Sequence, residues 1–325
     1  MHLRSVGQLL KETFHEWNQD KASRLAAALA YYTIFSIAPL LMIAIAVAGA
    51  VFGEEAARGE IVTQIEGLVG EAGATVVQTA LANVNQTNTG IVGTCIGVVT
   101  LLLGATGLFG EMQDALNTIW AVEPKPGQGI WVLIRRRLIS FSMVLGIGIL
   151  LLLSIFLSTA LAAFSSFMNS WMPGLATGLS ILNFVVSFSL MTLLFAMIYV
   201  ILPDVKIAWK DVLVGAATTA FLFTIGRTLL SMYLGSAAVS STFGAASSLA
   251  VLLVWIYYSA QVFFLGAEFT QVYARKYGSE IIPASNAVSV TTNRPPSVNP
   301  EKSSRIRSRR RSGFFTTIKR WFGRR

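Results

Sequence analysis

Residues 246–273 read ASSLAVLLVWIYYSAQVFFLGAEFTQVY and carry a single charged side chain, Glu268. A helix rises about 1.5 Å per residue, so a run of this length exceeds the ~30 Å hydrocarbon core of a bilayer. Five more long apolar runs precede it, at about residues 25–52, 91–110, 138–164, 178–202 and 212–234. Across all six runs the only other charged residue is Arg227.

These runs predict an all-α, polytopic membrane bundle of six transmembrane helices. Segments that span lipid must satisfy their own backbone hydrogen bonds, and none of the runs shows the period-2 alternation of a membrane β-barrel. A hydrophobic fraction of 54% and a mean hydropathy of +0.63 agree with this class. We expect one membrane domain over residues 25–280, with no room for a separate soluble enzyme domain.

The basic residues beside the runs predict the orientation. The N-terminal segment, the second and fourth loops and the C-terminal tail hold all the basic residues outside the runs except Arg58. Cytoplasmic loops carry an excess of Lys and Arg. Six spans with both termini in the cytoplasm fit this alternation.

Two segments outside the spans have helical patterns. Val6, Leu10, Phe14 and Trp17 share one face of residues 1–24, which predicts an amphipathic helix. It either lies on the cytoplasmic membrane surface or packs against the bundle. The acidic loop at 53–90 should fold as two short amphipathic helices on the outer face.

The helical pattern of the second run continues beyond the predicted membrane edge to Trp120, and prolines follow. Its polar residues form either a polar cytoplasmic mouth or a solvated helix face. These residues are Glu111, Gln113, Asp114 and Asn117.

The C-terminal tail concentrates the positive charge. Thirteen of the 25 basic residues, but only two of the 16 acidic ones, follow residue 273. We expect residues 281–325 to be disordered and to end in a basic amphipathic helix that binds anionic lipid headgroups. Nucleic acid is the less favoured partner. The residues assigned to the lipid surface are Arg309, Arg310, Arg311, Lys319, Arg320 and Trp321.

Ionisable residues inside a span are costly, so each requires a reason. By helical rise, Arg227 and Glu268 lie at different depths. Better partners for Arg227 are Asn183 and Ser187 on the fourth span, or a solute that carries negative charge. Tyr257, Gln261 and Glu268 form one polar stripe along the sixth span. The stripe lines a pathway or forms an interhelical hydrogen-bond seam.

The first span carries polar residues and a proline that removes a backbone donor, which predicts a kink. The hypothesis of a solute pathway therefore includes nine residues: Arg227, Asn183, Tyr257, Gln261, Glu268, Tyr31, Tyr32, Ser36 and Pro39.

Four motifs in this order resemble the YihY/BrkB family of bacterial inner-membrane proteins, once labelled ribonuclease BN-like. They are AALAYYTIFSIAPLL at 27–41, GLFGEMQDALNTIW at 107–120, LPD at 202–204 before WKDVLVG at 209–215, and TFGAASSLAVLLVWIYYSAQVFFLGAEF at 242–269. The likeness covers about residues 10–280. It implies a six-span protein of the inner (cytoplasmic) membrane with poorly defined activity, often supposed to be transport or envelope-related, and it supplies no catalytic residues.

Chemistry argues against the ribonuclease label. RNA hydrolysis needs gathered metal-binding carboxylates or histidines, or an acid–base pair. The only histidines are His2 and His15, the cytoplasmic acids are scattered, and Cys95 is the single cysteine. We therefore expect no enzyme, no metal and no cofactor.

Two functions remain. The first is a transporter or exporter of an anionic or lipid-like solute. The second is a non-transporting envelope scaffold, whose bundle anchors the basic tail, or a membrane protein related to virulence or stress. The sequence leaves open a homo-oligomer and does not name the solute.

Overall fold

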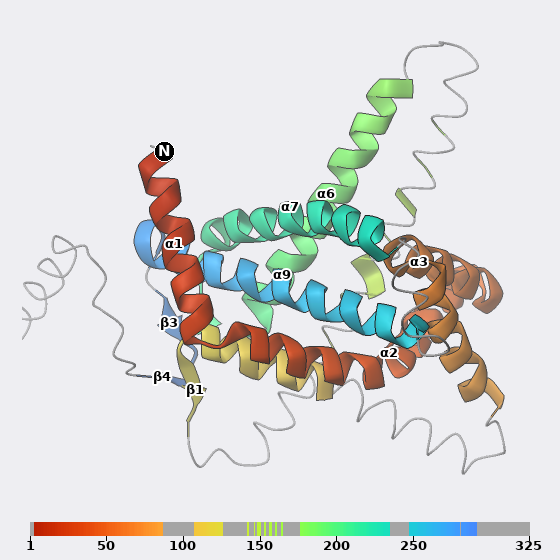
Figure 1. The fold of residues 1–325 in the computed structure, drawn as a ribbon, viewed down its shortest axis with the longest axis horizontal. Coiled ribbons are helices and arrows are strands. Elements are labelled where there is room, and N and C mark those ends of the chain that lie inside the picture. Colours follow the sequence, from red (N-terminus) through yellow and green to blue (C-terminus); the bar gives the residue numbers. More distant parts are fainter. Residues whose placement is uncertain are drawn as a thin grey trace, which may run out of the picture. The chain divides into compact units, whose positions relative to one another are not determined.

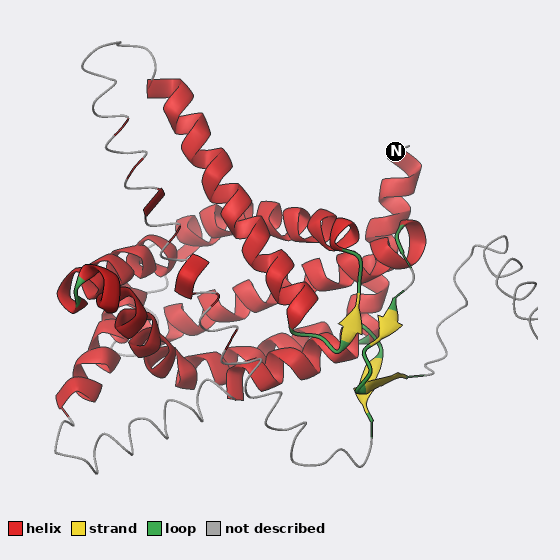
Figure 2. Cartoon of the chain, turned by 180° about the vertical axis from the view of Figure 1, so that it is seen from behind, coloured by secondary structure: helices red, strands yellow, loops and turns green. Residues whose placement is uncertain are grey.

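The computed structural model describes residues 3–86, 107–125, scattered positions between 142 and 164, 176–234, 247–279 and 281–290. They belong to one compact unit, Met1–Val290; a second unit, Thr291–Arg325, lies outside the described residues. Helices make up most of the first unit (Figures 1 and 2). The described helices are α1 (Leu3–Gln19), α2 (Ala22–Phe52), α3 (Glu54–Gln86), residues 107–119, α6 (Ala176–Ile201), α7 (Trp209–Leu234) and α9 (Ser247–Tyr277).

Three of the described helical segments are long and apolar enough to cross a membrane. They are Ile181–Ile201 in α6, Trp209–Leu230 in α7 and Ser248–Tyr277 in α9. These segments coincide with the predicted fourth, fifth and sixth spans, and α2 covers the first as a single helix. The second and third predicted spans fall largely outside the described residues. The number of six spans and the orientation of the termini therefore stay predictions.

Single residues with unusual backbone angles separate the first three helices. Lys21, at φ 54°, adopts a left-handed conformation between α1 and α2. Gly53, at φ 88°, separates α2 from α3, a conformation that glycine adopts without strain. Between these residues α2 is helical throughout, position 39 included; the side chain of Pro39 lies outside what the structure describes.

The segment after Gly53 differs from its prediction. Instead of two short helices, residues 54–86 form the single 33-residue helix α3. No proline interrupts this stretch, and its glycines lower helix propensity without removing a backbone donor. α3 contacts both α2 and α9.

Helices α7 and α9 pack closely through two pairs of residues, in each of which a threonine of one helix lies against a glycine of the other. The side chain of Thr270 on α9 lies against Gly215 of α7, and the side chain of Thr219 on α7 lies against Gly266 of α9. Each threonine donates a hydrogen bond to the glycine carbonyl four residues earlier in its own helix, at 2.8 Å for Thr219 and 2.6 Å for Thr270. Glycine at these positions lets two helices approach closely.

Tyr199 ties α6 to the same region. Its hydroxyl donates to the Phe263 carbonyl of α9 at 2.6 Å and lies 3.2 Å from the Thr219 hydroxyl of α7. The side chain is fully buried. A buried phenol needs such partners, so this bond fixes the relative position of the three helices.

Short strands correct the prediction that disorder begins at residue 281. β1 (Val122–Pro124) pairs with β4 (Ala287–Ser289), and β2 (Val205–Lys206) pairs with β3 (Ile282–Pro283), both antiparallel. The prediction rests on the Ser, Asn, Pro and Arg content of the tail, whereas residues 281–290 are mostly apolar and their pairing partners lie far away in the sequence. The rest of the tail, with all its predicted lipid-binding residues and terminal helix, lies outside the described residues.

α1 packs against the C-terminal end of α9, which it crosses in Figure 1. Arg275 pairs with Glu16 at 2.8 Å, and Lys276 pairs with Glu12 at 2.7 Å. One of the two predicted arrangements, packing on the bundle, is therefore present.

Candidate ligand cavity

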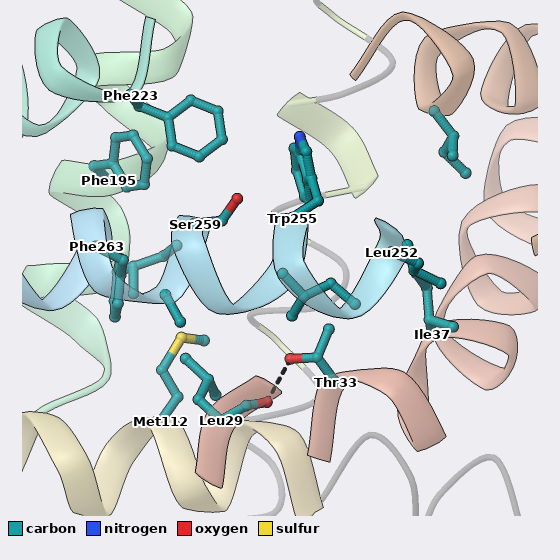
Figure 3. Close-up of a pocket in the computed structure, with 14 residues that line it drawn as sticks. Leu29, Thr33, Ile37, Met112, Phe195, Phe223, Leu252, Trp255, Ser259 and Phe263 are labelled. Carbon is teal, nitrogen blue, oxygen red and sulfur yellow. Dashed lines mark hydrogen bonds between the residues drawn. The ribbon is translucent and has the colours of Figure 1, made fainter. Parts of the chain in front are cut away.

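A cavity of about 260 Å³ lies between helices of the bundle. Leu29 and Thr33 of α2 and Met112 of the 107–119 helix line one side, and Phe195 of α6 and Phe223 of α7 line another (Figure 3). The other lining residues are Ile37, Ile65, Ile198, Leu252, Trp255, Ile256, Ser259, Ala260 and Phe263.

α9 contributes more to the lining than any other helix described. Leu252, Trp255, Ile256, Ser259 and Phe263 lie at helical spacing, so one face of α9 turns toward the cavity. The Trp255 and Phe223 rings meet edge to face with centroids 6.1 Å apart. α9 therefore both forms the seam with α7 and presents its side chains to the cavity.

The lining is almost entirely apolar. Among the described lining residues none is charged, and hydroxyl groups come from Thr33 and Ser259. The Thr33 hydroxyl already donates to the Leu29 carbonyl at 2.7 Å, as Figure 3 shows. Ser259 and the Trp255 indole project from α9 on the side where Phe223 lies. This surface suits a hydrocarbon group with at most one or two polar atoms.

The residues predicted to form a pathway lie elsewhere. Arg227, Asn183 and Tyr257 are exposed, Gln261 is half-buried, and none of them lines the cavity. Arg227 thus lies on an exposed face of the described helices, and its part in a pathway stays a prediction. Its side chain is long enough for the charge to reach outward along an apolar helix surface.

Glu268, the other intramembrane charge, is fully buried. Two positions along a helix correspond to a rotation of about 200°, so Glu268 lies on the face of α9 opposite Gly266 and Thr270. Its position agrees better with an interhelical contact than with the lining of the cavity.

The pathway residues predicted on the first span differ in their exposure to solvent. Tyr31 and Tyr32 are exposed, with their rings edge to face at 5.8 Å, whereas Ser36 is buried. The ring of Tyr32 lies beside Gly107, close enough that a Cβ there would approach it to 3.3 Å. None of the three residues lines the cavity, but Thr33 between them does.

A buried polar cluster lies where the described helices end. The Asp204 carboxylate accepts hydrogen bonds from the side-chain amides of Gln113 at 3.3 Å, Asn117 at 3.0 Å and Asn286 at 2.8 Å. The Asp204 backbone N–H donates to Asn117 Oδ1 at 2.8 Å. The cluster joins the 107–119 helix to the α6–α7 connection and to the β3–β4 segment.

The polar residues of the 107–119 helix, predicted as a polar mouth or a solvated face, differ in their burial. Gln113 and Asn117 are buried within it, whereas Asp114 is exposed to solvent and Glu111 is half-buried. Burial raises the pKa of the Glu111 carboxyl, and the nearby Asp114 charge raises it further. The polar residues thus form a packed junction on one face and a solvated surface on the other.

No pattern in the sequence points to the cavity. α9 is apolar around most of its circumference, so the cavity-facing residues do not stand out from those that face other helices. Within the described residues, no three His, Cys, Asp or Glu side chains are grouped as metal ligands.

Comparison with known proteins places the chain in a family. The family described as "Virulence factor BrkB" matches residues 13–290, which includes the β3–β4 segment. A UPF0761 membrane protein of Mannheimia succiniciproducens is 30% identical, over 82% of this chain and 89% of the relative. Another, of Photobacterium profundum, is 31% identical over 77% of this chain and 76% of the relative.

A UPF0761 membrane protein of Histophilus somni is 26% identical over 83% of this chain and 92% of the relative. No solved structure matches the chain. These relatives are named as membrane proteins, in keeping with the long apolar helices. The chain belongs to the YihY/BrkB family of membrane proteins.

Proposed function

We propose that this protein is a transporter or exporter of a lipid-like solute, which binds in the cavity between α2, α6, α7 and α9. The observation that carries the proposal is the described part of the lining, in which no side chain is charged and aromatic and aliphatic groups predominate. An anionic group bound there would lack a cation from the lining. Of the two solute classes that the sequence suggested, the lipid-like one is therefore favoured.

The position of the cavity supports the same solute class. Its walls include three helical segments long enough to cross a bilayer, so a hydrocarbon chain could reach it without passing through water. Binding sites between helices of a bundle are common for small ligands. The proposal involves binding and movement of a solute, with no chemical step.

The first test fills the cavity. Ser259→Trp places a large ring in the lining, whereas Leu253→Trp changes an exposed position of the same helix as a matched control. The probe is a phospholipid with a diazirine-bearing acyl chain, in proteoliposomes of phosphatidylethanolamine and phosphatidylglycerol. We expect photolabelling of the α9 peptide in the wild-type protein, a several-fold loss in Ser259→Trp and no loss in Leu253→Trp.

The second test measures movement. A headgroup-labelled fluorescent phospholipid in the same vesicles becomes accessible to an aqueous reductant when it crosses the bilayer. The transport proposal predicts faster crossing with the wild-type protein and Leu253→Trp than with Ser259→Trp. Equal labelling and equal crossing rates in all three proteins would refute it and favour the scaffold alternative. Comparable folding of the variants is checked by gel filtration and thermal unfolding.

A further inference from the structure

The apolar face that the sequence assigns to α1 is split in the structure. Trp17 is buried, together with Leu9, in the contact of α1 with the bundle. Leu10 and Phe14 instead remain 55% and 62% exposed, and Val6 is exposed beside them. Because these three residues are spaced by four, they form one stripe along the outer side of the helix. We call Val6, Leu10 and Phe14 the outer stripe.

The ion pairs with α9 define where the outer stripe lies. Glu12 and Glu16 are one turn apart on α1, and they bind the consecutive residues Lys276 and Arg275 in the last turn of α9. The 31 residues of α9 extend for about 46 Å as a helix, which is longer than a ~30 Å hydrocarbon core. Its charged last turn therefore falls at headgroup level, and α1, which crosses that turn, lies there too (Figure 1).

The charges around the outer stripe suit an anionic surface. The two acidic residues of α1, Glu12 and Glu16, are engaged with α9, and Asp20 at the turn into α2 also has an interaction partner, whereas Lys11, next to Leu10, is exposed. Lys21 and Arg24, at the turn into α2, are exposed as well. Among the described residues these three cations form no ion pair. An apolar stripe bordered by cations is the arrangement by which helices lie in the plane of a membrane.

We propose that α1 is an interfacial helix whose outer stripe inserts into the anionic-lipid leaflet at the C-terminal end of α9. The basic-residue distribution predicts this leaflet to be the cytoplasmic one. The ion pairs with Arg275 and Lys276 hold α1 crosswise on α9, so the helix joins the membrane surface to the helix that lines the cavity. The inference does not depend on the proposed transport function.

The test places a fluorescent reporter at single cysteines in full-length protein carrying Cys95→Ser, in phosphatidylethanolamine–phosphatidylglycerol nanodiscs. Leu10→Cys and Phe14→Cys report on the outer stripe; Gln8→Cys and His15→Cys are controls at exposed polar positions of the same helix. We expect the stripe reporters to be quenched by a lipid with a nitroxide near its headgroup and protected from aqueous iodide. The control reporters should show the reverse.

Two outcomes would overturn the proposal. If iodide quenches the stripe reporters as strongly as the controls, the outer stripe lies in water. If neither quencher reaches the stripe reporters, protein covers them, and a second copy of the chain becomes the occupant. A second measurement tests the ion pairs: Glu12→Lys should lower lipid quenching at Phe14→Cys, and Glu12→Lys with Lys276→Glu should restore it. Absence of both changes would show that the pair does not position the helix.

Discussion

The interlocked contact between α7 and α9 makes Gly266→Ala the sharpest test of the fold. A Cβ at position 266 would overlap the Thr219 side chain, because the Cβ and Cγ2 atoms of Thr219 would both lie only 2.8 Å from it. Thr219 has little freedom to move aside, because it is β-branched and its hydroxyl is bonded to the Gly215 carbonyl at 2.8 Å. The two helices must therefore separate to admit one methyl group.

The expected magnitude follows from two opposing terms. Overpacking of a tight contact costs about 1–3 kcal/mol. Replacing a helical glycine by alanine returns up to ~1 kcal/mol through helix propensity. We expect a net loss of about 1–2 kcal/mol in the free energy of unfolding for Gly266→Ala. Gly226→Ala should cost less, because the atom it meets first is the hydroxyl at the end of the longer Tyr258 side chain, which can rotate away.

Thermal unfolding of purified protein in one detergent measures these differences, with Gly110→Ala as the matched control. Position 110 is helical, and a Cβ there would meet nothing within 4 Å, so this variant should be as stable as the wild type or slightly more stable. Thr219→Gly should offset part of the cost of Gly266→Ala, giving a favourable coupling of about 1 kcal/mol in a double-mutant cycle. Equal midpoints for Gly266→Ala and Gly110→Ala would refute the interlocked seam.

Three further predictions concern the polar contacts. Asp204→Ala leaves buried amides without their acceptor and should lower the free energy of unfolding by about 1–3 kcal/mol, whereas Asp204→Asn should cost less; equal thermal midpoints for the two variants would contradict this. Because the folded-state pKa of Glu111 is raised, its charge destabilises the fold above that pKa, so Glu111→Gln should stabilise at pH 7 and lose its advantage as the pH falls toward 4; a gain that is independent of pH would count against the burial of this carboxyl. Arg275→Ala should destabilise the fold more than Lys276→Ala, because Glu16, the partner of Arg275, is buried. The Lys276–Glu12 pair is exposed and worth at most about 1 kcal/mol, so high salt should reduce only the effect of Lys276→Ala.

Length and apolarity were enough to predict most of the helices. The helices α2, α6, α7 and α9 coincide with four of the predicted spans, because a long apolar run has few stable alternatives to a helix. The continuation of the second run past its predicted membrane edge is likewise present as the helix at 107–119. The four motifs also predicted the family, which the comparison confirms.

The contacts between distant segments were not predictable in the same way. Asn117 and Asp204 are 87 positions apart, and no local pattern indicates that their side chains meet. Residues 281–290 precede a tail rich in Ser, Asn, Pro and Arg, and no local pattern indicates that they gain backbone hydrogen bonds from β1 and β2. The polar stripe of α9 is visible in the sequence because polar residues contrast with an otherwise apolar helix. The cavity side of α9, with Trp255 at its centre, is apolar like its surroundings, so the sequence does not distinguish it.

The packing of α9 also indicates where the proposed cavity can open. On the α7 side, the seam and the bond from Tyr199 to the Phe263 carbonyl hold α9 in place. On the α2 side, Leu29 and Thr33 of the lining present only apolar atoms and a hydroxyl already bonded within α2. Dispersion contacts of this kind can slide and reform without breaking a buried hydrogen bond, whereas movement of α9 away from α6 would break the Tyr199–Phe263 bond. The proposed transport function therefore predicts that a solute enters by movement of α2 relative to α9, with α6, α7 and α9 moving as a single unit.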